Sequence, residues 1–441
     1  MTAIVLVFIF FCLILIGVPI AVALGGSALA TSLLLSPLPP AIIGQKIFGN
    51  LEHLTLMAVP FFFFASALME SGGLVKRLIA LSNSLVGHWR GGLGITTVLT
   101  CVFFAALSGS SPATVAAVGR IMYPALLNAG YSTRYALGAL TTAGSIGILI
   151  PPSIPMLIYA FVTETSVTRL FLAGVVPGII YAAGMVVAAR FLALKEDIAP
   201  QERMSWPGRG QALLNAGPAL MLPLMIIVGI YGFPDFSIGG LEVSGGALFT
   251  PTEAAVLATF LAFLIGWLVY RELTVRTAIQ RVIDTAPSVG MIFFITTNAL
   301  FFAFFITQLG IPQWVTETLV ALDMPLWMFL LMINILLVIV GFFLEGVPTI
   351  LMFVPVLFPA AREMGIDPVH FAIIVIVNIE LGLVTPPVGL NLFVGSAISN
   401  QPATVVLRGT LPWMVVTVAV LILVTYVPGI SLWLPNYVFG D

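Results

Sequence analysis

The sequence predicts an all-α polytopic membrane protein made of two inverted-topology repeats. Three observations lead to this fold class: the composition, the interrupted apolar runs and an internal repeat. Of the 441 residues, 60% are hydrophobic and only 8% are charged, whereas an ordinary soluble domain has about 25% charged residues. So few polar side chains cannot cover a soluble protein of this size, and most of the surface must therefore face lipid.

The composition also excludes several classes of function. The net charge is −2 and no run rich in Lys or Arg occurs, so the chain offers no electrostatic footprint for nucleic acid. His53, His88 and His370 are too scattered to suggest a metal site. No Walker motif or Ser/His/Asp arrangement is present, so we expect neither ATP hydrolysis, nor an enzyme, nor an organic cofactor.

The apolar runs are long enough for many membrane spans. A bilayer core about 30 Å thick needs about 20 apolar residues per helix. We expect spans near residues 4–33, 56–75, 135–162, 170–193, 210–232, 251–270, 287–308, 369–399 and 408–428. The first run is interrupted at Gly17 and Pro19, which leaves open whether it is one span or two and on which side the N-terminus lies. No Lys or Arg precedes this run and similar runs recur along the chain, so it is interpreted as a span and not as a signal peptide.

Two further apolar regions, residues 93–128 and 326–361, are interrupted midway by polar residues and proline. The first contains SGSSPAT at 108–114 and the second LEGVPT at 344–349. Each half is about 15 residues, which is short for a full crossing. We therefore predict two re-entrant helical hairpins, which are tolerated only where protein or an aqueous cavity satisfies the exposed backbone.

The positive-inside rule orients the chain. Segments 71–92, 190–209 and 271–285 carry Lys and Arg and are expected in the cytoplasm. Segments 233–250 and 309–325 contain no Lys or Arg and are expected outside. The first hairpin thus follows a cytoplasmic segment and the second follows an external one.

An internal repeat relates the two halves. The residues Thr114, Pro124, Ala125, Gly130, Gly147, Pro151 and Pro152 recur 235 positions later as Thr349, Pro359, Ala360, Gly365, Gly382, Pro386 and Pro387. We accordingly divide the chain into a first repeat at 1–194 (hairpin 93–128, broken helix 135–162), a cytoplasmic linker at 195–210 and a second repeat at 211–441 (hairpin 326–361, broken helix 369–399). Inverted repeats with hairpins and broken helices are typical of secondary transporters.

The double prolines define the most informative segments, 143–155 and 379–391. Two adjacent prolines near a glycine are expected to unwind the helix for several residues. The freed carbonyls suit a small hard cation, and the half-helix N-termini that follow suit a carboxylate. The hydroxyls at the hairpin tips, Ser108, Ser110, Ser111, Thr114 and Thr349, either line a site or bond to carbonyls within their own helices.

Charged residues at membrane depth are functional candidates. Arg120, in the returning arm of the first hairpin, is either a substrate counter-ion or a structural pairing partner. Glu345, at the second tip, either attracts cations or is a solvated tip residue. Glu380, before the second double proline, is a candidate for a cation-related role. Glu70 and Glu164 lie near span ends and are expected to touch interface water.

These motifs resemble the large membrane subunit (M subunit, DctM-like) of the tripartite ATP-independent periplasmic transporters. The matching segments are GVPIAVALG at 17–25, SGSSPATVAAVG at 108–119, GILIPPSIPMLIYA at 147–160, EGVPTILMFVP at 345–355 and LGLVTPPVGLNLFV at 381–394. The resemblance covers nearly the whole chain. It implies an elevator architecture like that of the ion transporter superfamily, a place in the bacterial inner membrane and sodium-driven uptake of a carboxylate such as a C4-dicarboxylate or a sialic acid. It also implies two partners, a small four-helix membrane subunit, expected here as a separate chain, and a periplasmic substrate-binding protein.

Carried over by position, the resemblance implies two sodium sites, sodium being the only metal expected. The residues implied are Ser108, Ser110, Ser111, Gly147, Ile150 and Pro152 for the first site, and Gly346, Thr349, Gly382 and Thr385 for the second. For the substrate we expect Ser111, Thr114, Ser145, Ser153 and Asn391, in the same segments. The alternatives are a single-component symporter or an anion efflux protein of the same plan, and a membrane subunit without a site of its own. The particular carboxylate, the sodium stoichiometry and the oligomeric state do not follow from the sequence.

Overall fold

A computed structural model describes residues 2–35, 39–49, 52–196, 198–232, 236–238, 241–243 and 246–440. Within these residues the protein is almost wholly helical, and one buried apolar core runs through both halves of the chain. Seven helices in the described ranges are long and apolar enough to cross a membrane. The all-α, multi-pass prediction is therefore confirmed, with one small β-hairpin added to it.

The first half begins with two helices where one long apolar run was found. Its helices are α1 (Thr2–Leu15), α2 (Ile20–Leu35), α3 (Pro40–Gly49), α4 (Leu54–Ser71), α5 (Leu74–Val86), α6 (Gly92–Ser108), α7 (Ser111–Asn128), α8 (Thr133–Gly144), the 3-10 turn η2 (Ser145–Ile148), α9 (Ile154–Thr163) and α10 (Val167–Ala193). Gly17, between α1 and α2, has a φ of +86°, a left-handed conformation that ends the first helix.

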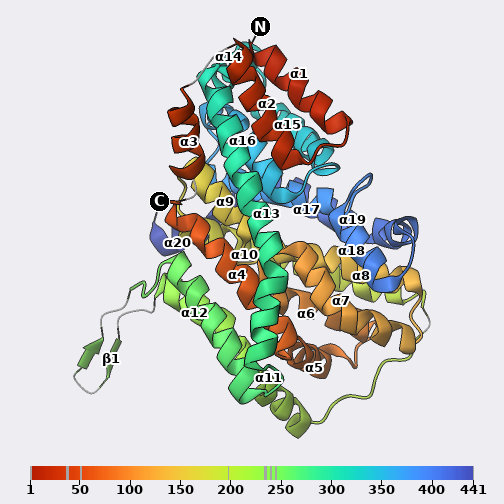
Figure 1. The fold of residues 1–441 in the computed structure, drawn as a ribbon. Coiled ribbons are helices and arrows are strands. Elements are labelled where there is room, and N and C mark those ends of the chain that lie inside the picture. The colour runs from red at the N-terminus through yellow and green to blue at the C-terminus, as the bar shows by residue number, and fades with distance from the viewer. Residues whose placement is uncertain are drawn as a thin grey trace.

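The second half repeats this plan after a longer opening. Its elements are α11 (Trp206–Tyr231), β1 (Phe236–Ile238), β2 (Leu241–Val243), α12 (Pro251–Leu264), the π-helical turn η3 (Ile265–Val269), α13 (Val275–Gln308), α14 (Ile311–Ala321), α15 (Leu326–Gly341), α16 (Gly346–Glu363), α17 (Pro368–Leu383), α18 (Leu390–Ser399), α19 (Ala403–Tyr426) and α20 (Gly429–Phe439). The long α13 runs along the length of the molecule, and the antiparallel strands β1 and β2 project away from the helices (Figure 1).

The helix pairs predicted as hairpins and both broken helices are present, while the re-entrant course of the hairpins in the membrane stays a prediction. Helices α6 and α7 form the first hairpin, and α15 and α16 form the second. Helix α8 is separated from α9 by η2 and residues 149–153, which we call the first break. Helix α17 is separated from α18 by residues 384–389, the second break. In each case the helix is lost over the double proline, as the missing backbone donors require.

The 235-residue offset extends to the helix ends. Helices α7 and α16 begin at 111 and 346 and end at 128 and 363, and α8 and α17 begin at 133 and 368. Beyond the double prolines the offset becomes 236, because the second break contains one more residue; α9 and α18 begin at 154 and 390, and α10 and α19 at 167 and 403. This correspondence supports two structural repeats, while their opposite orientation in the membrane stays a prediction.

Contacts between the halves are reciprocal. The Asn391 side chain donates to Ser111 Oγ at 2.8 Å. The counterparts of these two residues, Pro155 and Gly346, also approach each other, since a Cβ at Gly346 would lie 3.8 Å from Pro155 Cγ. A contact that recurs with its two partners exchanged is typical of units related by a two-fold axis.

Segments 71–92 and 309–325, which were expected to be loops, contain short helices. Helix α5 buries Leu74, Val75, Leu78 and Leu81 along one face, and α14 packs against α16. Both are shorter than a membrane span, so a search for long apolar runs does not detect them. The short helices α3 and α20 were missed for the same reason.

Candidate functional site

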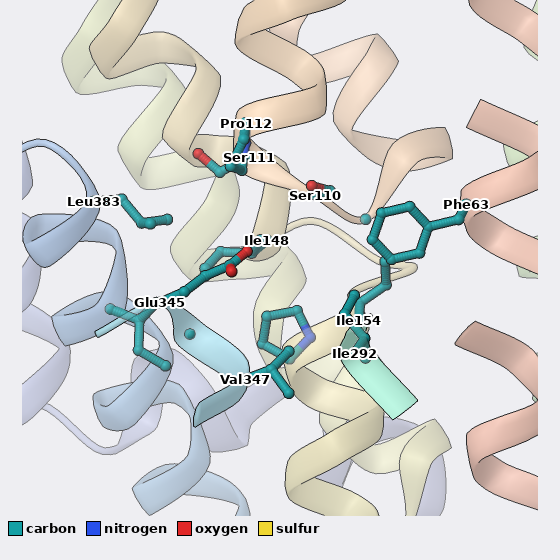
Figure 2. A pocket seen from close by; sticks show the side chains of 14 residues that line it. Phe63, Ser110, Ser111, Pro112, Ile148, Ile154, Ile292, Glu345, Val347 and Leu383 are labelled. Carbon is teal, nitrogen blue, oxygen red and sulfur yellow. The ribbon is translucent and has the colours of Figure 1, made fainter. Parts of the chain in front are cut away.

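The two hairpin tips and the two broken helices meet around one cavity, which we call the central cavity (Figure 2). Its walls come from residues 109–112 at the first tip, 345–347 at the second tip, Ile148, Ile154 and Pro155 at the first break, and Ile379 and Leu383 before the second. Phe63 of α4 and Ile292 of α13 complete the wall. The cavity volume is about 30 Å³, which is room for about one water molecule.

The first tip packs tightly onto the first break. The backbone N–H of Ile154 donates to the carbonyl of Gly109 at 3.2 Å. A Cβ at Gly147 would lie only 2.8 Å from Thr114 Oγ1 and 3.0 Å from the Ser110 carbonyl oxygen. Only glycine allows this approach, which brings two carbonyl-bearing segments and a hydroxyl together at one place.

The hydroxyls of the first tip form a short network. Ser108 Oγ lies 2.8 Å from Thr114 Oγ1, and Thr114 donates to the Ser110 carbonyl at 2.9 Å. Ser153, at the start of α9, donates to the Ile148 carbonyl at 2.5 Å and so fastens the end of the first break. The structure thus gathers the residues predicted for the first sodium site. Ile150, which was expected there for its backbone, lies in the first break, and its side chain points to Gly178 of α10.

The second tip repeats one bond of the first. Thr349 donates to the Glu345 carbonyl at 2.9 Å, one turn earlier in its own chain, as Thr114 does to the Ser110 carbonyl, and Thr385 donates to the Leu381 carbonyl at 2.6 Å. The glycine contact differs, because the three atoms nearest to a Cβ at Gly382 all belong to the backbone of Gly341 in α15. The end of α17 therefore packs on the outgoing arm of the second hairpin, whereas Gly147 packs on the tip of the first.

The predicted substrate residues separate into two groups. Ser111 lines the central cavity and accepts a hydrogen bond from the Asn391 side chain. The side-chain amide oxygen of Asn391, Oδ1, is buried without a hydrogen-bond partner in the described structure. Thr114 lies behind them in the hydroxyl network of the tip. Ser145 and Ser153 are fully buried and do not line this cavity.

Ser145 belongs instead to a buried polar group between the halves, which we call the axis cluster: Ser145, Tyr181, Glu380 and Thr417. The Tyr181 hydroxyl lies 2.8 Å from Ser145 Oγ and 2.7 Å from Thr417 Oγ1. Glu380 lies beside Ser145 and the backbone N–H of Ile148, but neither carboxyl oxygen reaches hydrogen-bond geometry within the described residues. Glu380 follows Ser145 by 235 positions and Thr417 follows Tyr181 by 236, so repeat counterparts face each other here.

The sequence interpretation missed Tyr181 and Thr417. Neither lies in a motif, and their relation becomes visible only when the repeat is followed past the double prolines with a one-residue gap. Phe63 and Ile292 were missed because apolar residues on remote helices carry no local signal.

The three charged candidates occupy different places. Arg120 forms an ion pair with Glu70 of α4 at 2.6 Å, with their side chains 63% and 34% exposed. It borders a separate opening between α7 and α18, so the structure shows it as a pairing partner. Glu345 lines the central cavity at the second tip (Figure 2), and Glu380 is fully buried in the axis cluster.

A solved structure with the same fold is the Alcanivorax borkumensis YdaH transporter. The likeness has a TM-score of 0.61 at 13% identity and covers 90% of this chain and 88% of that one. At this identity the likeness concerns the fold, which is that of a multi-pass membrane transporter.

The sequence comparisons define the family. Residues 7–430 match the family described as tripartite ATP-independent periplasmic transporter, DctM component, and the chain belongs to it. It is 43% identical to the C4-dicarboxylate TRAP transporter large permease protein DctM of Pseudomonas aeruginosa, over 94% of each chain. It is 32% identical to the sialic acid TRAP transporter large permease protein SiaM of Vibrio cholerae, over 97% of each. The predicted family and inner-membrane location are therefore confirmed, and the protein is a transporter permease and not an enzyme.

Proposed function

We propose that this permease carries out sodium-coupled uptake of a small organic acid, a C4-dicarboxylate, a sialic acid or a similar carboxylate. The observation that carries this proposal is the convergence of two hairpin tips and two broken helices on one cavity. Freed carbonyls and hydroxyls at the first tip and break suit a small hard cation, and the N-termini of α9 and α18 suit a carboxylate. The names of the relatives, which cite C4-dicarboxylates and sialic acid, support this substrate class.

The first sodium ion would be held by the first tip with Gly147 and Pro152, where the tip hydroxyls and carbonyls approach the first break. The second would be held by Gly346, Thr349, Gly382 and Thr385. The two sites need not have equal affinity, because Ser111 at the first tip is replaced by Gly346 at the second. The substrate would bind beside Ser111 and Asn391.

The central cavity has room for about one water molecule, so an organic acid would require the tips to separate or the wall to move. We propose an elevator motion, in which the hairpins and broken helices slide against α4 and α13. The apolar side chains of Phe63 and Ile292, which face the cavity from these two helices, provide a surface without hydrogen bonds to break.

The permease would act with a small membrane subunit and a periplasmic substrate-binding protein, as the tripartite family description suggests. The test is reconstitution of the chain in liposomes with and without these two partners. Uptake that needs an inward sodium gradient and both partners is the expected result. Uptake by the chain alone would show a single-component symporter, and uptake that ignores sodium would refute the proposed coupling.

The stoichiometry has an electrical consequence. Two sodium ions with a monocarboxylate move one net charge inward, whereas two with a doubly charged dicarboxylate move none. Each charge moved through 100 mV yields about 2.3 kcal/mol. Voltage-insensitive uptake of a monocarboxylate would exclude the two-ion stoichiometry, and electrogenic dicarboxylate uptake would require a third cation.

A further inference from the structure

Two arginines and a histidine gather near the start of α11, away from the central cavity. Burial, the guanidinium group of Arg209 and that of Arg203 lower the pKa of His88, so both arginines lie close enough to act on the imidazole and favour its neutral form. Within the described part of the chain, neither arginine forms an ion pair, although Glu202 precedes Arg203 directly. By contrast, Lys76 and Arg77, in the first turn of α5, share the carboxylate of Glu272.

Arg209 is the least satisfied member of this group. Its Nε and one terminal nitrogen are buried, and neither has a hydrogen-bond partner among the described residues. The guanidinium group lies 5.3 Å from the ring of Trp206. Arg209 is the fourth residue of α11, where the helix dipole already places partial positive charge. A cation is therefore disfavoured here unless an anion accompanies it.

The surroundings place this group at the level of lipid headgroups. Helix α11 is a candidate span that begins at Trp206, and the positive-inside rule puts this end in the cytoplasm. Trp206 is 76% exposed and Trp89, beside His88, is 43% exposed, as expected for aromatic residues at a membrane interface. Leu213 and Leu214, further along α11, are also exposed and would face acyl chains.

We propose that Arg209, with Arg203 and His88, binds the phosphate of an anionic phospholipid at the cytoplasmic surface. The planar guanidinium group matches phosphate oxygens. Its two buried donors would bond to them once the headgroup displaces the exposed Trp206 ring, which lies over the guanidinium group. The positive end of α11 would add to the attraction. Basic groups between helices on the cytoplasmic side bind anionic lipid headgroups in this manner.

The experiment measures thermal stabilisation of the purified, delipidated full chain by added phosphatidylglycerol in detergent. Phosphatidylcholine and inorganic phosphate are the comparison ligands. The variants are Arg209→Gln and Arg209→Lys, and Arg276→Gln is the matched control because Arg276 is exposed, lies in another cytoplasmic segment and makes no ion pair in the described structure. We expect phosphatidylglycerol to stabilise the wild type, and the half-saturating lipid concentration to rise about tenfold in Arg209→Gln, less in Arg209→Lys and not at all in Arg276→Gln.

Three results would overturn the proposal. Equal stabilisation by inorganic phosphate would indicate a soluble anion site. An equal loss in Arg209→Gln and Arg276→Gln would indicate a general effect of surface charge. The third result has two parts: the small membrane subunit abolishes lipid binding, and Arg209 is required for the two subunits to associate. Together they would show that Arg209 contacts the small subunit and not a lipid. Size-exclusion profiles identify variants that fail to fold, and for those the Arg209→Lys variant and an Arg203→Gln variant test the same site.

Discussion

Replacing Gly147 by alanine is the sharpest test of the proposed first sodium site. The added Cβ would lie 2.8 Å from Thr114 Oγ1, 3.0 Å from the Ser110 carbonyl oxygen and 3.1 Å from Ser111 Cα. An ordinary carbon contact is about 3.5–4.0 Å, so the first tip must retreat by about 0.5 Å. Binding geometry is lost at displacements of about this size.

Overpacking of this kind costs about 1–3 kcal/mol, and about 1.4 kcal/mol corresponds to a tenfold change in affinity. We therefore expect the sodium concentration for half-maximal uptake to rise at least about fivefold in Gly147→Ala proteoliposomes. The chain should still purify as a folded species, because the clash is confined to the tip.

Gly290→Ala is the matched control, since a Cβ at Gly290 in α13 meets no atom within 4 Å. It should leave the sodium dependence unchanged. A folded Gly147→Ala protein with the wild-type sodium dependence would refute the assignment of Gly147 to a cation site.

Three further predictions concern other contacts. Ser111→Ala and Asn391→Ala should show a coupling of about 1 kcal/mol in the free energy of unfolding, measured by a double-mutant cycle, because their hydrogen bond is buried; additive effects would mean that the bond is not made. Glu380→Gln should leave the thermal midpoint unchanged or raised, since it removes a buried carboxyl group that lacks a hydrogen bond, and should reduce uptake more than tenfold; wild-type uptake would exclude a transport role. Partial burial raises the pKa of Glu272, but the hydrogen bonds from Arg77 and Lys76 together lower it by more than burial raises it. The pKa of Glu272 therefore lies below its usual value. The stabilisation is present above the pKa of an unfolded Glu, about 4.3, and is lost as the pH falls through the lower folded pKa. The thermal midpoint of the wild type should therefore fall more between pH 5 and pH 3 than that of Glu272→Gln, and equal falls would show that the ion pair contributes nothing.

The sequence predicted the hairpins well because their signal is local. Hairpins expected at 93–128 and 326–361 are observed at 92–128 and 326–363, since glycine, proline and hydroxyl residues within apolar runs mark the tips directly. Helix α5 was not predicted, because 13 residues with polar groups on one face resemble a loop when spans of 20 are sought.

The candidate site was predicted only as far as its motifs extend. The tips and breaks were located correctly, and the structure brings both tips, the first break and the end of α17 to one cavity. Which of their residues touch depends on packing between segments that are far apart in the sequence. The bond from Asn391 to Ser111 joins residues 280 positions apart, and no local pattern specifies it.

The differences between the halves are as informative as the repeat. Ser111 and Asn391 form a hydrogen bond, whereas their counterparts Gly346 and Pro155 meet only through apolar contact. The central cavity therefore offers the Ser111 hydroxyl, supported from behind by Asn391, on one side and only Gly346 at the equivalent position on the other, so a substrate held here would be bound asymmetrically.

The axis cluster shows why such asymmetry is necessary. A residue close to a two-fold axis lies near its own counterpart, as Ser145 does with Glu380. If both positions held glutamate, two carboxylates would share one buried site, and at most one could ionise without strong repulsion. A single carboxyl group can exist in this place only because the two halves have diverged there. The chemistry that a repeat adds to a symmetric fold therefore has to arise at positions where its two copies differ, and Glu380, fully buried opposite Ser145, is such a position.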